Sequence, residues 1–249
     1  MSLLLEGKVV LITGGARRVG AATARRLHAS GANVLLHYRS AHADAQALQA
    51  ELQAVRPDSC GLVAADLLDV AGLPQLVKNT LARFGRLDAL VNNASSFYPT
   101  PVGEITVEQW EDLMGTNLKA PLFLAQAAAP HLKKTAGCIV NVTDIHGERP
   151  LKNYVVYSVA KAGLIGLTRS LARELGPEVR VNGVSPGPVL WPEDNSFDEL
   201  ARQRIIAHTL LRRAGEPDDI ACAVHFFVAE APYVTGQILA VDGGRSINL

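Results

Sequence analysis

A tyrosine and a lysine four residues apart form the clearest chemical pair in the sequence. Tyr157 and Lys161 lie in the stretch 154–161, which reads YVVYSVAK. On a helix, a spacing of four places both side chains on one face. A phenol has an ordinary pKa near ~10, and a neighbouring ammonium favours the charged form. The pair therefore predicts a tyrosine whose pKa is lowered toward neutrality, where it suits proton transfer.

A glycine-rich stretch near the N-terminus predicts a phosphate site. Residues 13–20 read TGGARRVG and stand between an apolar run and a stretch of helical period. Glycines at a strand-to-helix turn let backbone N–H groups approach a pyrophosphate at the positive end of the helix. The cofactor contacts expected in this turn are Gly14, Arg17, Arg18 and Val19.

The end of the second expected strand indicates which dinucleotide binds. It reads LHYRS over 36–40, with no Asp or Glu where an acidic side chain would bind the ribose 2′-hydroxyl of NAD. An arginine with hydroxyl and imidazole neighbours suits a 2′-phosphate instead, so we predict NADPH as the cofactor. A solvated loop charge is the alternative for the arginine. The expected contacts are His37, Tyr38, Arg39 and Ser40.

Asp66 and Leu67 follow the third expected strand. Two roles fit Asp66 equally well, a hydrogen bond to the adenine edge of the cofactor and a cap on the helix that follows. We include both residues among the expected cofactor contacts.

Seven short apolar runs alternate with longer stretches of helical period, which is the pattern of a parallel sheet built from β-α units. The runs are continuous, as in strands that are covered on both faces. We expect a single α/β domain over 1–249, a doubly wound Rossmann fold with a seven-stranded parallel sheet flanked by helices. Strands are expected at 9–13, 33–37, 61–65, 89–93, 138–142, 179–184 and 237–241, and helices near 18–30, 43–56, 71–84, 105–113, 117–133, 154–175 and 216–229.

Two further features concern the ends of these elements. Gly31, Gly85 and Gly176 each follow an expected helix and are predicted as its C-terminal glycine. The region of about 186–209 has no clear period and is expected to be a loop or lid beside the substrate. Ligands are expected beyond the carboxyl ends of the strands.

Composition and charge exclude several classes of partner. Lys and Arg number 24 and Asp and Glu also number 24, which argues against affinity based on wholesale attraction to nucleic acid or acidic membranes. Residues 1–40 nevertheless hold six basic residues and one acidic residue, in the unit assigned to cofactor phosphates. The three cysteines have no metal-ligand spacing, and no apolar run reaches the roughly 18 residues of a membrane span. We expect a cytoplasmic protein without a metal site.

Taken together with further motifs, these residues resemble the short-chain dehydrogenase/reductase family over essentially the whole chain. The resemblance implies hydride transfer with NADPH, with Tyr157 as proton donor, Lys161 on the nicotinamide ribose and Asn117 anchoring a water relay to Lys161. It also implies a homotetramer formed through helices within 105–133 and 154–175. The further motifs are Asn92-Asn93-Ala94, Asn117, Pro186-Gly187 and Val241-Asp242-Gly243-Gly244, of which Asn93, Ala94, Pro186 and Gly187 would lie along the cofactor.

Two departures from the general family pattern resemble the pteridine reductase subgroup. Arg18 stands where most members have glycine, and Asp144 replaces the usual catalytic serine. The stretch 92–101, NNASSFYPTP, is also very similar to that subgroup. The resemblance implies that Phe97 stacks on a pterin, while Ser95 and Arg18 bind pterin and cofactor together. The implied substrate is a dihydropterin such as dihydrobiopterin, dihydromonapterin or dihydrofolate, with oxidised pterins as further substrates.

Asp144 changes what is expected of the tyrosine. A carboxylate close to Tyr157 opposes phenolate formation, because two neighbouring groups disfavour double ionisation. The tyrosine would then stay protonated, which suits a reductase that donates a proton. Two alternatives remain open. One is an NADPH-dependent carbonyl or 3-oxoacyl thioester reductase of the same family, and the other is a catalytically idle dinucleotide-sensing or scaffold protein.

Overall fold

The computed structural model describes residues 4–189 and 198–248, and in this part of the chain all seven expected strands are present. They form one parallel sheet in the order β3-β2-β1-β4-β5-β6-β7. The chain leaves β1 toward β2 on one side and later returns to β4 on the other, so β1 and β4 flank the switch point of the sheet. The strands are β1 Val9–Ile12, β2 Asn33–Tyr38, β3 Cys60–Ala64, β4 Ala89–Asn92, β5 Cys138–Val142, β6 Arg180–Pro186 and β7 Ile238–Val241.

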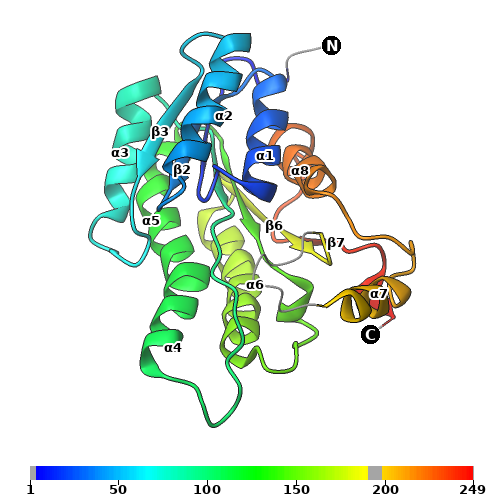
Figure 1. Cartoon of the computed structure of the whole chain (residues 1–249). Helices are drawn as coiled ribbons and strands as arrows, with labels where there is room; N and C mark the ends of the chain where they lie inside the picture. The colour runs from blue at the N-terminus through cyan, green and yellow to red at the C-terminus, as the bar shows by residue number, and fades with distance from the viewer. Residues whose placement is uncertain (1–3, 190–197, 249) are drawn as a thin grey trace.

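Helices cover both faces of the sheet, as the continuous apolar strands predicted (Figure 1). One face is covered by α1 Arg18–Ala29, α2 His42–Val55 and α8 Pro217–His225. The other face is covered by α3 Leu73–Phe84, α5 Ala120–Lys133 and α6 Val155–Leu175. Successive residues of β1 point to opposite faces, so Val10 and Ile12 pack with the first layer and Leu11 with the second. Within the described residues no helix is both long and apolar enough to cross a membrane.

The helical region before β5 differs from the expected pair of separate helices. α4 Val107–Met114 continues through a π-helical turn, Gly115–Lys119, directly into α5. A π-turn inserts an extra residue into the helix and is frequent at functional sites. Here the turn contains Asn117, which is buried.

Two of the three predicted C-terminal glycines adopt the left-handed backbone that only glycine reaches at low cost. Gly31 has φ +102° and Gly85 has φ +75°. Gly176 directly follows α6 as predicted, but it has φ −71° and ψ 150°, an extended conformation open to any residue, so it does not form a left-handed cap.

The region 186–209, expected to be an irregular loop or lid, contains the helix α7, Glu199–Ala207. This helix buries none of its side chains, so its residues show no apolar stripe from which a helix could be predicted. It begins at Asp198, whose side chain accepts a hydrogen bond from the N–H of Ala201 at 2.7 Å. Residues 190–197 of the expected lid lie outside the described part of the chain.

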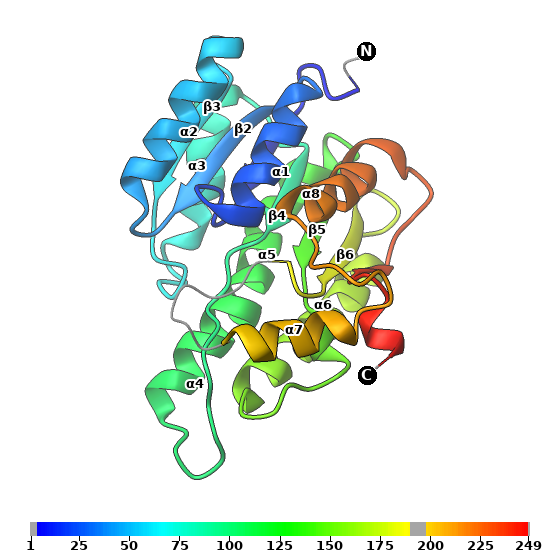
Figure 2. The ribbon, with the colours of Figure 1, turned by 45° about the vertical axis from the view of Figure 1, so that its right-hand side comes forward.

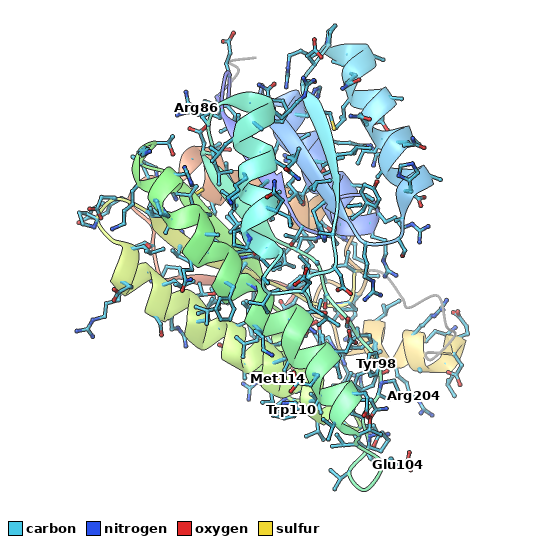
Figure 3. The ribbon with its side chains drawn as sticks, turned by 90° about the vertical axis from the view of Figure 1, so that its left-hand side faces the viewer. Arg86, Tyr98, Glu104, Trp110, Met114 and Arg204 are labelled. Carbon is cyan, nitrogen blue, oxygen red and sulfur yellow. The ribbon has the colours of Figure 1, made fainter. Side chains whose placement is uncertain are left out.

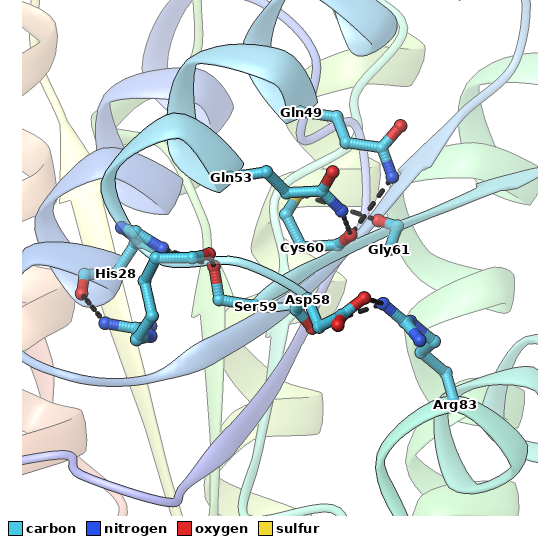
Figure 4. Close-up of polar contacts among 9 residues, drawn as sticks. His28, Gln49, Gln53, Asp58, Ser59, Cys60, Gly61 and Arg83 are labelled. Carbon is cyan, nitrogen blue, oxygen red and sulfur yellow. Dashed lines mark hydrogen bonds and ion pairs between the residues drawn. The ribbon is translucent and has the colours of Figure 1, made fainter.

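Polar contacts tie three helices to residues 58–60, where the chain enters β3 (Figure 4). The amides of Gln49 and Gln53 on α2 both donate to the carbonyl of Cys60, at 3.0 and 2.8 Å. From α1, the buried ring of His28 lies 2.7 Å from the hydroxyl of Ser59. From α3, Arg83 donates to Asp58 at 2.8 Å. These contacts fix the edge strand while its opposite end faces the site.

The burial of His28 predicts an acid-dependent loss of stability. Burial, and then the charge of Arg56, lower the pKa of His28 from its ordinary value of 6.5. The unfolded chain therefore binds more protons than the folded one below about pH 6.5, so stability is present above that pH and is lost as the pH falls through the folded pKa. We expect His28→Gln, which keeps a hydrogen-bonding group, to lose less of its free energy of unfolding on acidification than the wild type.

Urea unfolding at neutral and at mildly acidic pH measures this difference. His131→Gln on α5 serves as the control, and it should lose as much stability on acidification as the wild type. Equal losses in all three proteins would contradict the assignment to His28.

Candidate active site

A cavity of about 780 Å³ opens at the carboxyl ends of the strands, beside the switch point between β1 and β4. All the predicted site residues except Asn117 line it, although they come from many separate segments of the sequence. They are Gly14, Arg17, Arg18, Val19, His37, Tyr38, Arg39, Ser40, Asp66, Leu67, Asn93, Ala94, Ser95, Phe97, Asp144, Tyr157, Lys161, Pro186 and Gly187.

The turn after β1 leaves no room for side chains at its glycines. Gly14 has φ +60°, and a Cβ built there would lie 2.9 Å from the Cα of Ala94. A Cβ on Gly20 would overlap the carbonyl oxygen of Gly14 and lie 2.7 Å from Nδ2 of Asn93. The Asn93 amide in turn donates to the carbonyls of Thr13 and Gly14, at 3.0 and 2.9 Å. The turn is therefore a fixed backbone cradle of the kind that receives a pyrophosphate.

His37 holds this turn in place. The N–H of Gly14 donates to its Nδ1 at 3.2 Å, and its Nε2 lies 3.1 Å from the carbonyl oxygen of Ala65, which can only accept. The ring is therefore neutral with its proton on Nε2, and burial lowers its pKa from 6.5. His37 was expected to contact the 2′-phosphate. With both ring nitrogens engaged by backbone groups, it acts on the cofactor site by positioning Gly14.

Basic side chains gather where β1 and β2 end. Arg17, Arg18 and Arg39 all line this part of the cavity. Arg18 has φ +51°, a left-handed conformation that is unusual for arginine. Arg17 donates to Asp44 of α2 through Nε at 2.7 Å. Asp66 also lines the cavity, and its Oδ1 accepts from the N–H of Leu68 at 3.0 Å, which caps a local turn rather than α3.

The chemical centre is a hydrogen bond between two acids. The hydroxyl of Tyr157 donates to Oδ2 of Asp144 at 2.7 Å, and Oδ1 of Asp144 accepts from the N–H of His146 at 2.8 Å. Tyr157 is 4% exposed. Burial first, and then the negative charge of Asp144, raise the pKa of Tyr157 well above its ordinary value. The tyrosine therefore stays protonated at neutral pH, as the aspartate led us to expect.

The prediction that Lys161 lowers the pKa of Tyr157 is wrong. The ammonium of Lys161 is 5.6 Å from the centre of the tyrosine ring and donates to the carbonyl of Val142 at 3.0 Å. Burial lowers the pKa of Lys161 to about 8, while the charge of Asp144 acts in the opposite direction. For the pKa of Tyr157, burial and the hydrogen-bonded carboxylate of Asp144 therefore outweigh the attraction of the more distant ammonium of Lys161.

Asn117 lies behind the cavity wall and shapes it. Its Oδ1 accepts from the hydroxyl of Ser95 at 2.7 Å, and its Nδ2 donates to the carbonyls of Ser96 and Leu113 at 3.0 and 2.9 Å. The side-chain amide is therefore engaged by the loop 95–96 and by the preceding helical turn. Its evident role is to hold Ser95 at the cavity, and a water relay to Lys161 stays a prediction.

Phe97 forms an aromatic wall beside the chemical centre. Its ring stacks on Tyr154 with centroids 4.5 Å apart and meets Tyr157 edge-on at 4.7 Å. Asp112 of α4 holds the loop that carries Phe97, because it accepts from the hydroxyls of Tyr98 at 2.9 Å and Ser96 at 3.2 Å. Figure 3 views this side of the molecule and labels Tyr98 near α4.

The cavity also contains residues that sequence reasoning did not select. Ala16, Gly20 and Ser96 belong to stretches already singled out in the sequence, whereas the others are brought to the cavity by the sheet topology. His146 is one of them, and its Nδ1 lies 2.9 Å from the carbonyl oxygen of Arg149. The added lining residues are Ala16, Gly20, Ala41, Ser96, Thr116, Val142, Thr143, His146, Leu151, Pro188, Val189, Ile205 and Arg245.

Comparison with known proteins agrees with this geometry. A family model described as "Enoyl-(Acyl carrier protein) reductase" matches residues 14–246. Pteridine reductase 1 of Leishmania tarentolae is 39% identical, with 96% of each chain covered. A putative ketoacyl reductase of the granaticin polyketide synthase from Streptomyces violaceoruber is 37% identical, with 97% of each chain covered, and 3-oxoacyl-[acyl-carrier-protein] reductase of Synechocystis is 34% identical, covering 96% of this chain and 97% of the relative.

A solved structure is also similar over nearly its whole length. It is a blue fluorescent protein from a metagenomic library in complex with NADPH, with a TM-score of 0.90, 37% identity and coverage of 97% and 98% of the two chains. A nucleotide-binding parallel sheet with a tyrosine and lysine at its edge defines a dinucleotide-dependent oxidoreductase. The chain belongs to the short-chain dehydrogenase/reductase family, and it is an NADPH-dependent reductase.

The crowding at Gly20 predicts the effect of adding a single methyl group. Gly20→Ala should weaken NADPH binding by about tenfold or more, because the new Cβ displaces either Gly14 or Asn93 and so opens the cradle. Gly166→Ala on α6 is the matched control, since a Cβ there meets nothing within 4 Å. The control should bind NADPH normally and be slightly more stable. Fluorescence titration with NADPH checks both variants, and normal binding by Gly20→Ala would contradict the assigned cradle.

Proposed function

We propose that this enzyme is a pteridine reductase that reduces a dihydropterin to the tetrahydro form with NADPH. The observation that carries the proposal is the 2.7 Å hydrogen bond from the hydroxyl of Tyr157 to the carboxylate of Asp144. It provides a buried, protonated acid of high pKa with a second acid directly behind it. This arrangement suits donation of a proton to a ring nitrogen more than removal of a proton from an alcohol.

The reaction reduces a C=N bond of the pterin. NADPH supplies a hydride to the ring carbon, and the adjacent ring nitrogen takes up one proton, so the products are NADP⁺ and the tetrahydropterin. Tyr157 is the proposed proton donor. If it lost its proton alone, a phenolate would stand beside a carboxylate, which is electrostatically unfavourable. Asp144 must therefore receive a proton before or during the step and pass it to Tyr157.

The cavity wall suits a flat heterocycle. Phe97 presents an aromatic face whose position is fixed by Tyr154 and Asp112. Ser95 and Arg18 provide polar contacts from the loops after β4 and β1. A pterin needs such an aromatic platform, polar partners for its 2-amino-4-oxo edge and an acid for its ring nitrogen. We assign Arg18, Ser95, Phe97, Asp144 and Tyr157 to the substrate.

The remaining lining residues fit NADPH. The backbone cradle at 14–20 suits the pyrophosphate, and Arg39 with Ser40 suits the 2′-phosphate at the end of β2. Lys161, which is 2% exposed and reaches the cavity beside Tyr157, is placed to hold the nicotinamide ribose. Gly187 lies against Asp242, where a Cβ would be 2.6 Å from the Cα of that residue, so the backbone is held close to the cofactor path.

A carbonyl or 3-oxoacyl thioester reductase is the second candidate, because reductases of that kind are among the relatives. Asp144, in place of the serine expected in such enzymes, speaks against it. A catalytically idle dinucleotide-sensing protein is the third, and the buried set of Tyr157, Lys161 and Asn117 speaks against that candidate.

We also propose that the enzyme is a homotetramer. Large apolar side chains stay exposed on α4, α5 and α6, among them Trp110, Leu122, Val155 and Val159, with 39–47% of each accessible. Figure 3 labels Trp110 near the lower end of α4. Burying these side chains between two copies would remove apolar surface from water. Sedimentation as a monomer at micromolar concentration would contradict the homotetramer.

All three cysteines are free, which supports the proposal of a cytoplasmic location.

One assay separates the three functions. Purified enzyme is mixed with NADPH and with a panel of dihydrobiopterin, dihydromonapterin, dihydrofolate, simple ketones and acetoacetyl thioesters, and the loss of nicotinamide absorbance is followed. We expect turnover with dihydropterins, faster toward acid pH because the Tyr157 and Asp144 pair must carry an added proton. Turnover of thioesters alone would identify the second candidate, and no turnover at all would identify the third.

Two substitutions test the paired acids. Asp144→Ser should lower turnover of the dihydropterin by roughly 100-fold, because the tyrosine loses the group that returns its proton. Tyr157→Phe should lose most turnover as well. Both variants should bind NADPH within about twofold of the wild type, since neither change touches the phosphate cradle. Full activity of Tyr157→Phe would show that another group donates the proton.

A further inference from the structure

Arg245 is a buried cation in the wall of the cavity, and the proposed reaction gives it no role. It lies in a short 3₁₀ turn, Arg245–Ile247, shortly after β7, and is 8% exposed. Its Nη1 donates to the carbonyl of Ile205 on α7 at 3.0 Å, and Arg245 and Ile205 both line the cavity. Figures 1 and 2 show the C-terminal segment lying beside α7. The guanidinium thus reaches the cavity from the C-terminal end of the chain.

No carboxylate forms an ion pair with Arg245 in the part of the chain that the structure describes. The nearest acid in sequence, Asp242, is engaged by the backbone, because its oxygens accept from the N–H groups of Gly244 at 2.8 Å and Ser246 at 2.7 Å. Burial lowers the pKa of Arg245, and the charge of Asp242 opposes this only in part. A buried guanidinium without a paired anion is costly, and an anionic ligand in the cavity would offset that cost.

The strand order determines which ligand can reach this cation. Along the edge of the sheet, the phosphate-binding arginines follow β1 and β2, Asp144 follows β5, and Arg245 follows β7. Neighbouring strands are about 4.8 Å apart, so the end of β7 lies roughly 10 Å from the end of β5, on the side away from the phosphate cradle. An anion at this end belongs to the substrate more naturally than to the cofactor.

Apolar side chains also line this cavity. Ile205 lies beside Arg245, which donates to its carbonyl, Leu151 packs with the cluster that contains Tyr157, and Val189 is a further apolar lining residue. A substrate tail in contact with these side chains would bury apolar surface, and its end could meet the cation. A tail with an aromatic middle and a carboxylate at its end offers both an apolar surface for these side chains and an anion for Arg245.

We propose that Arg245 binds a carboxylate at the end of the substrate's tail, so that the enzyme prefers dihydrofolate-like pterins to pterins with short neutral tails. The proposal rests on the proposed function. Guanidinium and carboxylate form charge-assisted, often bidentate hydrogen bonds, and Nη2 and Nε of Arg245 have no partner among the described residues. The bond to Ile205 would then hold the guanidinium in place for this contact.

Steady-state kinetics with two substrates tests the proposal. For Arg245→Met we expect KM for dihydrofolate to rise by about tenfold or more, with KM for dihydrobiopterin and both kcat values within about twofold of the wild type. Arg204→Met is the matched control, because Arg204 is an exposed arginine on α7, the helix that Arg245 contacts (Figure 3), and its replacement should leave both KM values unchanged. Arg245→Lys keeps the positive charge but cannot form the bidentate hydrogen bonds of a guanidinium. Its KM for dihydrofolate should therefore lie between those of the wild type and Arg245→Met.

A merely structural role gives a different result. If Arg245 only fastens α7, Arg245→Met lowers thermal stability and changes KM for both substrates alike, and this outcome overturns the proposal. An unchanged KM for dihydrofolate overturns it as well.

A second measurement covers the case in which Arg245→Met does not fold. In the wild type, 4-aminobenzoylglutamate should inhibit reduction of dihydrobiopterin about tenfold more strongly than its uncharged diamide. Equal inhibition by the two compounds overturns the proposal without any variant.

Failure of the proposed function is distinguishable from failure of this inference. If the wild type reduces no pterin but reduces acetoacetyl thioesters, the proposed function fails. The same variants are then compared on the coenzyme A ester, which carries phosphates, and on the neutral N-acetylcysteamine ester. A selective loss with the coenzyme A ester assigns Arg245 to a phosphate and rejects the carboxylate, while no selectivity rejects an anion site altogether.

Discussion

The joint between the ends of β1 and β4 is the contact on which the site depends. Thr13 and Asn93 meet there, because the Thr13 hydroxyl accepts from the N–H groups of Asn93 and Ala94 at 3.0 and 3.1 Å. The Asn93 amide returns two hydrogen bonds to the backbone of the glycine turn. This joint closes the gap that opens at the switch point and fixes the phosphate cradle against the loop that carries Ser95 and Phe97. Cofactor and substrate walls therefore share one rigid connection.

Two buried side chains support the loops on either side of this joint. His37 braces the glycine turn from β2 and reaches the end of β3 through Ala65, while Asn117 braces the Ser95 loop from the π-turn between α4 and α5. Both side chains are buried, and all the hydrogen-bonding atoms of their rings or amides are engaged. Neither needs to touch a ligand in order to matter, since a shift of either would displace a wall of the cavity.

Sequence reasoning predicted correctly those features that are marked by a local pattern of neighbouring residues. The glycine turn, the seven apolar strands and the Tyr157–Lys161 spacing each have a local pattern, and the structure brings them to one edge of the sheet. It failed where the answer depends on three-dimensional surroundings. The sign of the shift in the pKa of Tyr157 depends on burial and on which charge is nearer, and spacing along one helix reports neither. The helix α7 gave no signal because it packs none of its side chains into the core.

The neutral total charge of the chain conceals an ordered distribution of charge along the cavity. Arg17, Arg18 and Arg39 line the cavity at the β1–β2 end, and Arg245 lines it at the β7 end. Between them, Asp144 and Lys161 balance each other around a protonated tyrosine. A substrate held in the centre thus meets no excess charge while it accepts a hydride. Because buried charges act at close range in a poorly screened interior, this separation keeps the cationic groups at the two ends apart from the protonated tyrosine in the middle.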